Sequence, residues 1–144
     1  MPPFHLAFPV TDLEATRRFY CDVLGCRTGR ESDRWIDFDF WGHQLVAHLV
    51  PPEQHPQAAR NPVAGHEVPA SHFGPVLAWE EFEALRERLQ AAAVECVIEP
   101  HVRFAGRAGE QVTLFIRDPS GNHLEFKAFR DPAMLFERDL EAYR

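Results

Sequence analysis

The chain has 144 residues, a length typical of one domain with an ample hydrophobic core, and a formal net charge of −7. It has no cluster of Lys and Arg and no apolar segment near the roughly 20 residues that span a bilayer, which argues against nucleic acid and membranes as partners. A small neutral or cationic molecule, or a metal ion, is expected instead. The three cysteines form no C-x-x-C pair and the N-terminus lacks a secretion signal, so we expect a reduced, cytoplasmic protein.

The first fifty residues predict one strand, one helix and three further strands. Residues 4–10 alternate between a face that carries His5 and an aromatic face that should pack in the core. Asp12 can cap a helix whose apolar residues recur at helical spacing until Gly25 ends it. Further strands are expected over residues 26–30, 34–40 and 43–50.

The middle of the chain, residues 51–71, is rich in proline and histidine and has little periodicity, which predicts a connector or a lid. After it the same order of elements returns. A helix is expected with Phe82, Leu85 and Leu89 on its buried stripe. The second half should contain a strand at 71–78, the helix at 80–93, strands at 94–98 and 111–117, and a last strand after the turn Asp118-Pro119-Ser120-Gly121-Asn122.

The two halves align as a repeat of the order βαβββ. His5 lies over His72, 67 positions further on, and Gly42 lies over Gly121, 79 positions further on. The 12 extra residues of the second half fall between its second and third strands, around residues 100–110. A single loop insertion therefore explains the difference in spacing.

The same register places Val46 at the position that Glu125 occupies in the second half. Neither half can bury both faces of its sheet alone, so the expected fold class is α+β, with two βαβββ modules pairing into a curved mixed sheet around a cleft and helices outside. We expect a single domain, residues 1–144. Its parts are module 1 at 4–50, the connector at 51–71, module 2 at 72–129 and a C-terminal tail at 130–144.

Two histidines and one glutamate should converge in this cleft. His5 and His72 fall on the equivalent first strands of the two modules, and Glu125 falls on the last strand between two apolar residues. A buried carboxylate needs a cation or hydrogen bonds to offset its desolvation. Two imidazoles and one carboxylate form a facial triad, which suits Fe(II) or Mn(II) with open positions better than closed structural zinc. His5, His72 and Glu125 are therefore the predicted metal ligands.

Further polar and aromatic residues are predicted around the cleft. His48 shares the face of Val46, and His101 lies in the inserted loop, so both histidines are candidates for acid/base catalysis. The strand at residues 34–40 should pack its Ile and Phe side chains under the helix and send the alternate side chains toward the cleft or solvent. The residues predicted to contact the substrate are Trp35, Asp37 and Arg103.

These motifs resemble the vicinal-oxygen-chelate superfamily, which includes glyoxalases, bleomycin-resistance proteins and type I extradiol dioxygenases. The resemblance spans residues 4–129 and is nearest to extradiol dioxygenase-like members. By position, the family's metal ligands fall on His5, His72 and Glu125. The matching pieces are His5-Leu6-Ala7, Asp12-Leu13 with Phe19-Tyr20 and Leu24-Gly25, His72-Phe73-Gly74, and Asp118-Pro119-Ser120-Gly121-Asn122-His123-Leu124-Glu125-Phe126.

The resemblance implies an activity through the number of ligands. Glyoxalase-like isomerases take four protein ligands, and the fourth position here is Val46, which cannot coordinate a metal. Three ligands with open positions look like the extradiol dioxygenases, where Fe(II) holds a catecholate and dioxygen side by side. The implied protein is a homodimeric, dioxygenase-like enzyme that takes dioxygen and a small aromatic or vicinal-oxygen substrate. Its metal would be Fe(II), with Mn(II), Ni(II) and Zn(II) as alternatives.

Two other functions stay open at this point. One is a glyoxalase-like isomerase or lyase, and the other is a metal-free, resistance-type protein that binds a small molecule. Metal content separates the three, because iron or manganese supports the dioxygenase, nickel or zinc supports the isomerase, and no metal supports the binding protein.

Overall fold

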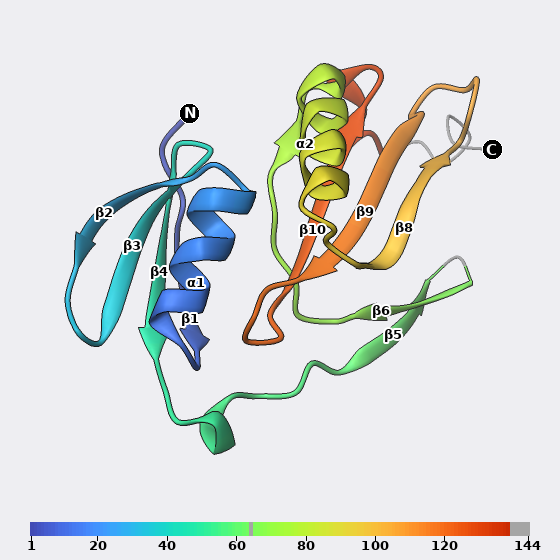
Figure 1. The fold of residues 1–144 in the computed structure, drawn as a ribbon. Helices are drawn as coiled ribbons and strands as arrows, with labels where there is room; N and C mark the ends of the chain where they lie inside the picture. Colours follow the sequence, from blue (N-terminus) through green and yellow to red (C-terminus); the bar gives the residue numbers. More distant parts are fainter. Residues whose placement is uncertain (64, 139–144) are drawn as a thin grey trace.

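The structure is a computed structural model that describes residues 1–63 and 65–138, and it consists of two modules joined by a long connector (Figure 1). Each module contains a four-stranded mixed sheet, and a helix covers the same side of both sheets. The α+β class and the two βαβββ modules are confirmed. Within the described residues no strand pairing joins the two sheets, so the expected curved mixed sheet is realised as two sheets lying side by side.

Module 1 has the strand order β1-β4-β3-β2, with β1 and β4 parallel. The helix packs on the sheet through Thr16, Phe19 and Tyr20, which are buried. Gly25 follows it at a φ of +82°, as expected of a residue that ends a helix. The elements are β1 (His5–Val10), α1 (Leu13–Arg17) continued by a π-helical segment (Arg18–Val23), β2 (Arg27–Glu31), β3 (Trp35–Phe40) and β4 (His43–Leu49).

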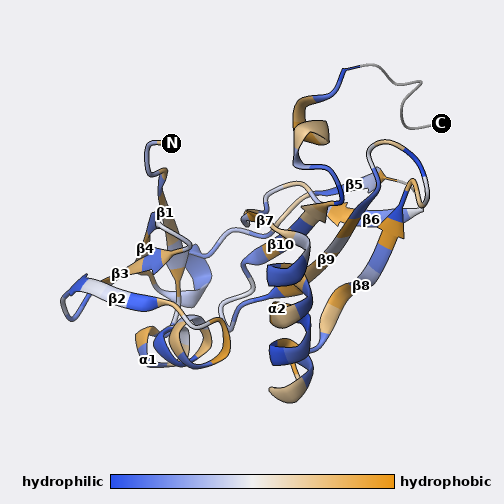
Figure 2. Cartoon of the chain, turned by 90° about the horizontal axis from the view of Figure 1, so that it is seen from above, coloured by the Kyte–Doolittle hydropathy of each residue, from blue (hydrophilic) through white to orange (hydrophobic). Residues whose placement is uncertain are grey.

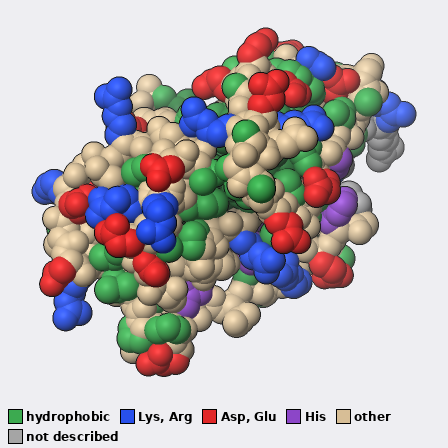
Figure 3. Space-filling model, in the orientation of Figure 1, with side chains coloured by type: hydrophobic (Ala, Val, Ile, Leu, Met, Phe, Trp, Pro, Cys, Tyr) green, Lys and Arg blue, Asp and Glu red, His purple; other side chains and the backbone are tan. Residues whose placement is uncertain are grey.

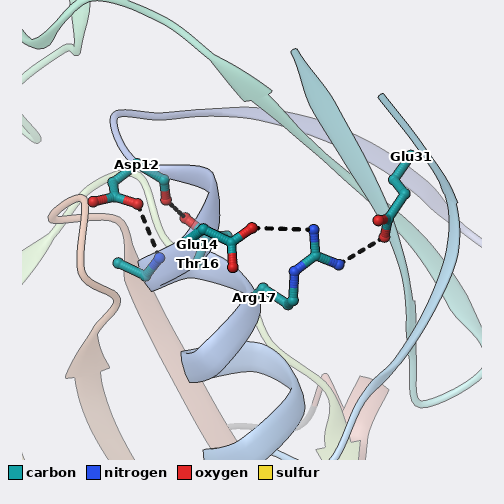
Figure 4. Close-up of polar contacts among 6 residues, drawn as sticks. Asp12, Glu14, Thr16, Arg17 and Glu31 are labelled. Carbon is teal, nitrogen blue, oxygen red and sulfur yellow. Dashed lines mark hydrogen bonds and ion pairs between the residues drawn. The ribbon is translucent and has the colours of Figure 1, made fainter. Parts of the chain in front are cut away.

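Polar contacts fix the start of α1 and hold it against β2 (Figure 4). The carboxylate of Asp12 accepts the backbone N–H of Ala15 at 2.9 Å, so the predicted cap is confirmed. Arg17, one turn further on, donates to Glu31 of β2 at 2.7 Å and to Glu14 at 3.4 Å. The short helix is therefore tied to the sheet edge at its polar side as well as through its buried face.

Module 2 has the strand order β7-β10-β9-β8. Phe82, Leu85 and Leu89 of its helix are buried, which confirms the predicted apolar stripe. Figure 2 shows apolar and polar residues recurring in turn along α2 and β8. The elements are β7 (Val76–Leu77), α2 (Trp79–Ala91), β8 (Cys96–Arg103), β9 (Gln111–Arg117), β10 (His123–Phe129) and a 3₁₀ turn (Pro132–Phe136). The predicted tail from residue 139 onward lies outside the described residues.

The strand pairings confirm the register of the repeat. Leu6 of β1 pairs with Leu45 of β4, and at the equivalent positions Phe73 bridges Leu124 of β10. Both pairings are parallel. The first strand of each module therefore lies beside the last strand of the same module, and Glu125 is the counterpart of Val46.

The strand expected over residues 71–78 is shorter in the structure. Its chain does run along β10, since the N–H of Phe73 donates to the carbonyl of His123 at 3.2 Å and the Phe73 carbonyl accepts from Glu125 at 2.9 Å. The ladder then breaks at Gly74 and Pro75 before β7 begins, because proline has no N–H to donate. His72 consequently sits just ahead of a regular strand and not inside one.

The connector forms a two-stranded antiparallel hairpin that its sequence did not predict, β5 (Arg60–Val63) with β6 (His66–Pro69). Its prolines obscured the strand pattern, although an isolated hairpin can accept proline where no neighbour needs its N–H. The hairpin lies over the face of the module 2 sheet that points away from α2 (Figure 2). This position makes it the cover of the site described below.

One hydrophobic cluster runs through both modules and includes Tyr20, Phe40 and Phe126. The rings of Phe8 and Phe73, one from each module, lie 5.3 Å apart between centroids. Figure 3 shows acidic and basic side chains interspersed over one face of the molecule, with hydrophobic side chains between them. None of the helices formed by the described residues is long and apolar enough to span a bilayer.

Candidate metal and substrate site

His72 and Glu125 form a close pair on the open face of the module 2 sheet. The His72 Nε2 atom lies 3.1 Å from Glu125 Oε2, and the two side chains are 28% and 14% exposed. Glu125 Oε1 accepts a hydrogen bond from the Thr113 hydroxyl at 2.7 Å and lies 3.4 Å from the Lys127 ammonium. The structure thus brings together two of the three predicted metal ligands, with the carboxylate held in place by β9 and β10.

The orientation of the His72 ring is fixed from its other side. His72 Nδ1 lies 2.7 Å from the backbone carbonyl of Pro69, at the end of the β5–β6 hairpin. A carbonyl can only accept, so Nδ1 carries the proton, and in the neutral imidazole Nε2 presents a lone pair to Glu125. Two lone pairs at this distance repel each other unless a cation separates them. Either a proton on Nε2 or a metal ion can fill that role.

The electrostatics of the pair follow from this contact. The hydrogen bond with Glu125 is the largest influence on His72 and raises its pKa above the ordinary value of 6.5. Burial is the largest influence on Glu125 and would raise its pKa, but the hydrogen bonds from His72 and Thr113 and the charge of Lys127 outweigh it, and the pKa is lowered from 4.5. Without metal, the pair is therefore an ion pair around neutral to mildly acidic pH.

The metal-free protein should be stabilised by this pair within a defined pH window. Because the pKa of His72 is raised, its contribution to the free energy of unfolding is complete below pH 6.5 and is lost as the pH rises through the pKa of His72 in the folded protein. Because the pKa of Glu125 is lowered, its stabilising contribution is complete above pH 4.5 and is lost as the pH falls through the pKa of Glu125 in the folded protein. Urea denaturation of chelator-treated protein should show the largest stability difference between wild type and Glu125→Gln at pH 4.5 to 6.5. An equal difference at pH 9 would contradict the pairing.

The pair opens into a cavity of about 210 Å³ between the module 2 sheet and the hairpin, here called the hairpin pocket. His101 and Arg103 of β8, both predicted site residues, line this pocket together with His72 and Glu125. The ring of His101 stacks on His66 of the hairpin, with 5.0 Å between ring centroids. The structure therefore groups two further predicted residues around the pair, and adds a hairpin residue that the sequence did not suggest.

The other predicted site residues lie on module 1. His5 is exposed on β1, and its Nδ1 lies 2.8 Å from the side-chain oxygen of Gln44. His48 and Trp35 pair across β4 and β3. Asp37 is buried and accepts from the Gln44 amide at 3.2 Å. These four residues share the open face of the module 1 sheet, and no group of three or more His, Cys, Asp or Glu side chains in the described part of the chain could hold a metal ion.

The turn before β10 has a structural role that the sequence did not reveal. Asp118 is 5% exposed, and its carboxylate accepts from Ser120 N, Asn122 N and the Asn122 amide, each at 2.9 Å. It also accepts from the hydroxyl of Tyr20 in module 1 at 2.9 Å. Asn122 in turn donates to the carbonyl of Pro9 on β1 at 2.8 Å. The turn therefore joins the two modules in addition to positioning Glu125.

Burial is the largest influence on the pKa values of Asp118 and Tyr20, which form the contact between the modules. It raises the pKa of the Asp118 carboxyl, although the hydrogen bonds from Asn122, Tyr20 and Ser120 act in the opposite direction. It also raises the pKa of Tyr20 well above its ordinary value, and the neighbouring carboxylate adds to the effect. Tyr20 therefore stays a hydrogen-bond donor across the working pH range, as the junction requires.

His123 is a further residue of the site region to which the sequence assigned no role. It is 7% exposed, and its Nε2 has no hydrogen-bond partner among the described residues. Burial, the largest influence, and the charges of Arg60 and Arg117 lower its pKa. His123 lies two residues before Glu125 on the same face of β10, so the alternation of that strand was the signal that could have placed it near the site.

Comparisons with known proteins agree on one family. A family model described as the Glyoxalase/Bleomycin resistance protein/Dioxygenase superfamily matches residues 3–126. A solved structure of a glyoxalase/bleomycin resistance protein/dioxygenase from Alicyclobacillus acidocaldarius is 32% identical, with a TM-score of 0.75 over 94% of this chain and 96% of that chain. Virulence protein STM3117 of Salmonella typhimurium is 27% identical over 125 residues, which are 87% of this chain and 82% of that protein.

A lactoylglutathione lyase from Agrobacterium tumefaciens has the same fold. It is 24% identical, with a TM-score of 0.61 over 89% of this chain and 96% of that chain.

Proposed function

The chain belongs to the Glyoxalase/Bleomycin resistance protein/Dioxygenase superfamily, and from this premise we propose that it is an Fe(II)-dependent, dioxygenase-like enzyme that works at the His72–Glu125 pair. The substrate is a small aromatic or vicinal-oxygen compound, taken together with dioxygen. The proposal rests above all on one observation: a backbone carbonyl holds Nδ1 of His72, so that Nε2 faces the carboxylate of Glu125.

This arrangement fits a metal centre. Histidines that bind metals commonly donate their second ring N–H to a carbonyl or carboxylate, which sets both the tautomer and the ring plane. Here the carbonyl of Pro69 accepts the second ring N–H of His72, while the hydroxyl of Thr113 donates to Glu125 and orients it. A bound Fe(II) with open positions would hold and polarise two oxygen ligands side by side. The donor set of one imidazole and one carboxylate leaves room for a third protein ligand.

We assign the third ligand to His5 of a second copy of the chain. Within one chain His5 stands exposed on the other sheet, away from the described groups that could share a metal with it. The homodimer expected from the sequence can bring the open face of module 1 in one copy against that of module 2 in the other. The three predicted ligands then meet at an interface and not within one chain.

His101 is the acid/base residue that this arrangement favours. It lines the hairpin pocket with the pair, and its Nδ1 lies 3.0 Å from the carbonyl of Glu99, which leaves Nε2 free to exchange a proton. His48 lies on the exposed face of module 1 and can take part only if the second copy brings it to the same site. The covering hairpin supplies Val63 and Val68 as apolar walls that limit access of water.

Metal content measured on protein purified without chelator tests the centre. Wild type should retain about one divalent ion per chain, and Glu125→Gln should retain less by about tenfold or more, because it removes the charged ligand while keeping the side-chain size. Glu87→Gln, on the exposed side of α2, is the matched control and should retain the wild-type amount. Full metal occupancy in Glu125→Gln would refute the assignment.

Mixing two defective variants tests the shared site. His5→Ala and Glu125→Gln should each bind little metal alone. After co-refolding, mixed dimers hold one intact site, made of His72 and Glu125 from the first variant and His5 from the second. Metal binding should therefore reappear, at about half an ion per chain in the mixed dimers. Persistent absence of metal in isolated mixed dimers would place the third ligand elsewhere.

Oxygen uptake after anaerobic loading with Fe(II) tests the reaction class. Uptake that depends on a catechol and disappears in His72→Ala supports ring cleavage. Iron-loaded protein that consumes no oxygen with any catechol would instead favour the isomerase or lyase function of this superfamily.

A metal-free binding protein is the second candidate function. It is favoured by the direct His72–Glu125 contact, which is already a satisfied ion pair without metal, and by the lack of a three-ligand group in the described part of one chain. Wild-type protein that retains no metal after growth with added iron, manganese, nickel or zinc would establish it.

A further inference from the structure

The hairpin pocket carries a local charge opposite to that of the whole chain. Its wall includes Arg103 and Lys127 together with the imidazoles of His66, His72 and His101. Among the described residues that line it, Glu125 is the one carboxylate. The chain as a whole has a formal net charge of −7. The overall charge predicts a neutral or cationic ligand, but the groups that a ligand meets inside this pocket are basic.

The carboxylate of Glu125 in the pocket already has partners within the protein. Glu125 contacts His72, Thr113 and Lys127, so its charge is shared among partners on the sheet. Arg103 lies within ion-pair distance of no carboxylate in the described residues, and its guanidinium instead lies 5.1 Å from the ring centre of Phe104. A half-buried guanidinium with unused donors can bind a carboxylate through two parallel hydrogen bonds.

The remaining walls limit the size of a ligand. Val63 and Val68 of the hairpin face Ile98 and Phe115 of the sheet across the pocket. A volume of about 210 Å³ admits a short chain but not a large ring system. The pocket therefore combines a cationic end, the His72–Glu125 pair and a short apolar section between the hairpin and the sheet.

We infer that the hairpin pocket selects a short-chain carboxylate, whose anionic group is bound by Arg103 and Lys127 while its neighbouring oxygen reaches the His72–Glu125 pair. This inference rests on the proposed function for the role of the pair and names the substrate class of that site. Arg103 is the specificity-determining residue, because its guanidinium meets no carboxylate among the described residues. The hairpin closes the pocket over the carbon chain, and His66 stacked on His101 forms part of that closure.

Binding of L-lactate and of its neutral analogue lactamide tests the charge selection. Nuclear magnetic resonance titration of the full-length protein, both as purified and after chelator treatment, should show lactate shifting the amides of β8 and β10. Lactamide should bind more weakly by about tenfold or more, because a hydrogen bond between charged groups is stronger than a neutral one. Equal affinity for the two compounds, or no shifts with lactate, would overturn the inference.

Two variants test whether Arg103 is the residue that recognises the carboxylate. Arg103→Gln should weaken the binding of lactate by about tenfold and leave the binding of lactamide unchanged, so the preference for the anion should be lost. Arg107→Gln removes a nearby exposed arginine that does not line the pocket and should behave as wild type. A lactate affinity unchanged in Arg103→Gln would overturn its role.

Metal content distinguishes failure of this inference from failure of the proposed function. Arg103 touches neither predicted ligand in the described contacts, so Arg103→Gln should retain metal as wild type does. Equal affinity of wild-type protein for lactate and lactamide, with normal metal content, refutes the carboxylate pocket alone. Wild-type protein without metal refutes the proposed centre, while the titration of chelator-treated protein still decides the charge selection.

Discussion

Replacing Asp118 with alanine is expected to lower the free energy of unfolding by about 3 to 5 kcal/mol. The carboxylate is buried and accepts four hydrogen bonds, so its removal leaves donors from Tyr20, Ser120 and Asn122 without a partner inside the protein. Because one of these bonds crosses between modules, the loss should also loosen their packing. Urea denaturation followed by circular dichroism measures the free energy of unfolding, and tryptophan fluorescence reports side-chain packing around Trp35 and Trp41 in module 1 and Trp79 in module 2.

A double-mutant cycle with Tyr20→Phe isolates the contact between modules. Tyr20→Phe alone should cost about 1 to 2 kcal/mol, since the ring stays and one buried hydrogen bond is lost. In the Asp118→Ala background the same change should cost much less. Asp22→Ala, an exposed aspartate on the π-helical segment, is the control and should stay within about 0.5 kcal/mol of wild type. Additive costs would show that the two residues do not act together.

Gly74→Ala is expected to destabilise the protein by about 3 kcal/mol and to damage the site as well. A Cβ atom at Gly74 would collide with the backbone carbonyl of Glu125 on β10. Backbone cannot move aside as a flexible side chain can, so the segment that carries His72 would have to shift away from β10. We therefore expect both a lower unfolding midpoint in urea and weaker metal retention from this one added methyl group.

Gly29→Ala is the matched control for this prediction. It also lies beside a strand, has no positive φ, and a Cβ there would meet the Cβ of Asp37 at 3.4 Å, an ordinary contact. Its stability and metal content should remain close to those of wild type. Should Gly74→Ala prove as stable as Gly29→Ala, the close approach of the two chains at Glu125 would be wrong.

The amino-acid sequence by itself determined the modular fold. Alternation and helical spacing located the helix stripe of Phe82, Leu85 and Leu89 and the cap at Asp12, because these signals come from neighbours within one element. The repeat gave the register that makes Glu125 the counterpart of Val46. In the structure Phe73 lies opposite Leu124, which brings its neighbour His72 close to Glu125. Local patterns were sufficient there because each module closes its first strand on its own last strand.

The tertiary structure decided which residues actually meet. It joined His72 to Glu125 but left His5, His48, Trp35 and Asp37 on another sheet, since a repeat fixes equivalence between modules and not their mutual placement. It also showed that the proline-rich connector folds into a hairpin over the site. The prolines obscure the strand pattern, and the contact of the hairpin with the distant module 2 sheet leaves little local trace in the sequence. The motif around Asp118 predicted a turn; only the fold showed that its carboxylate holds the two modules together.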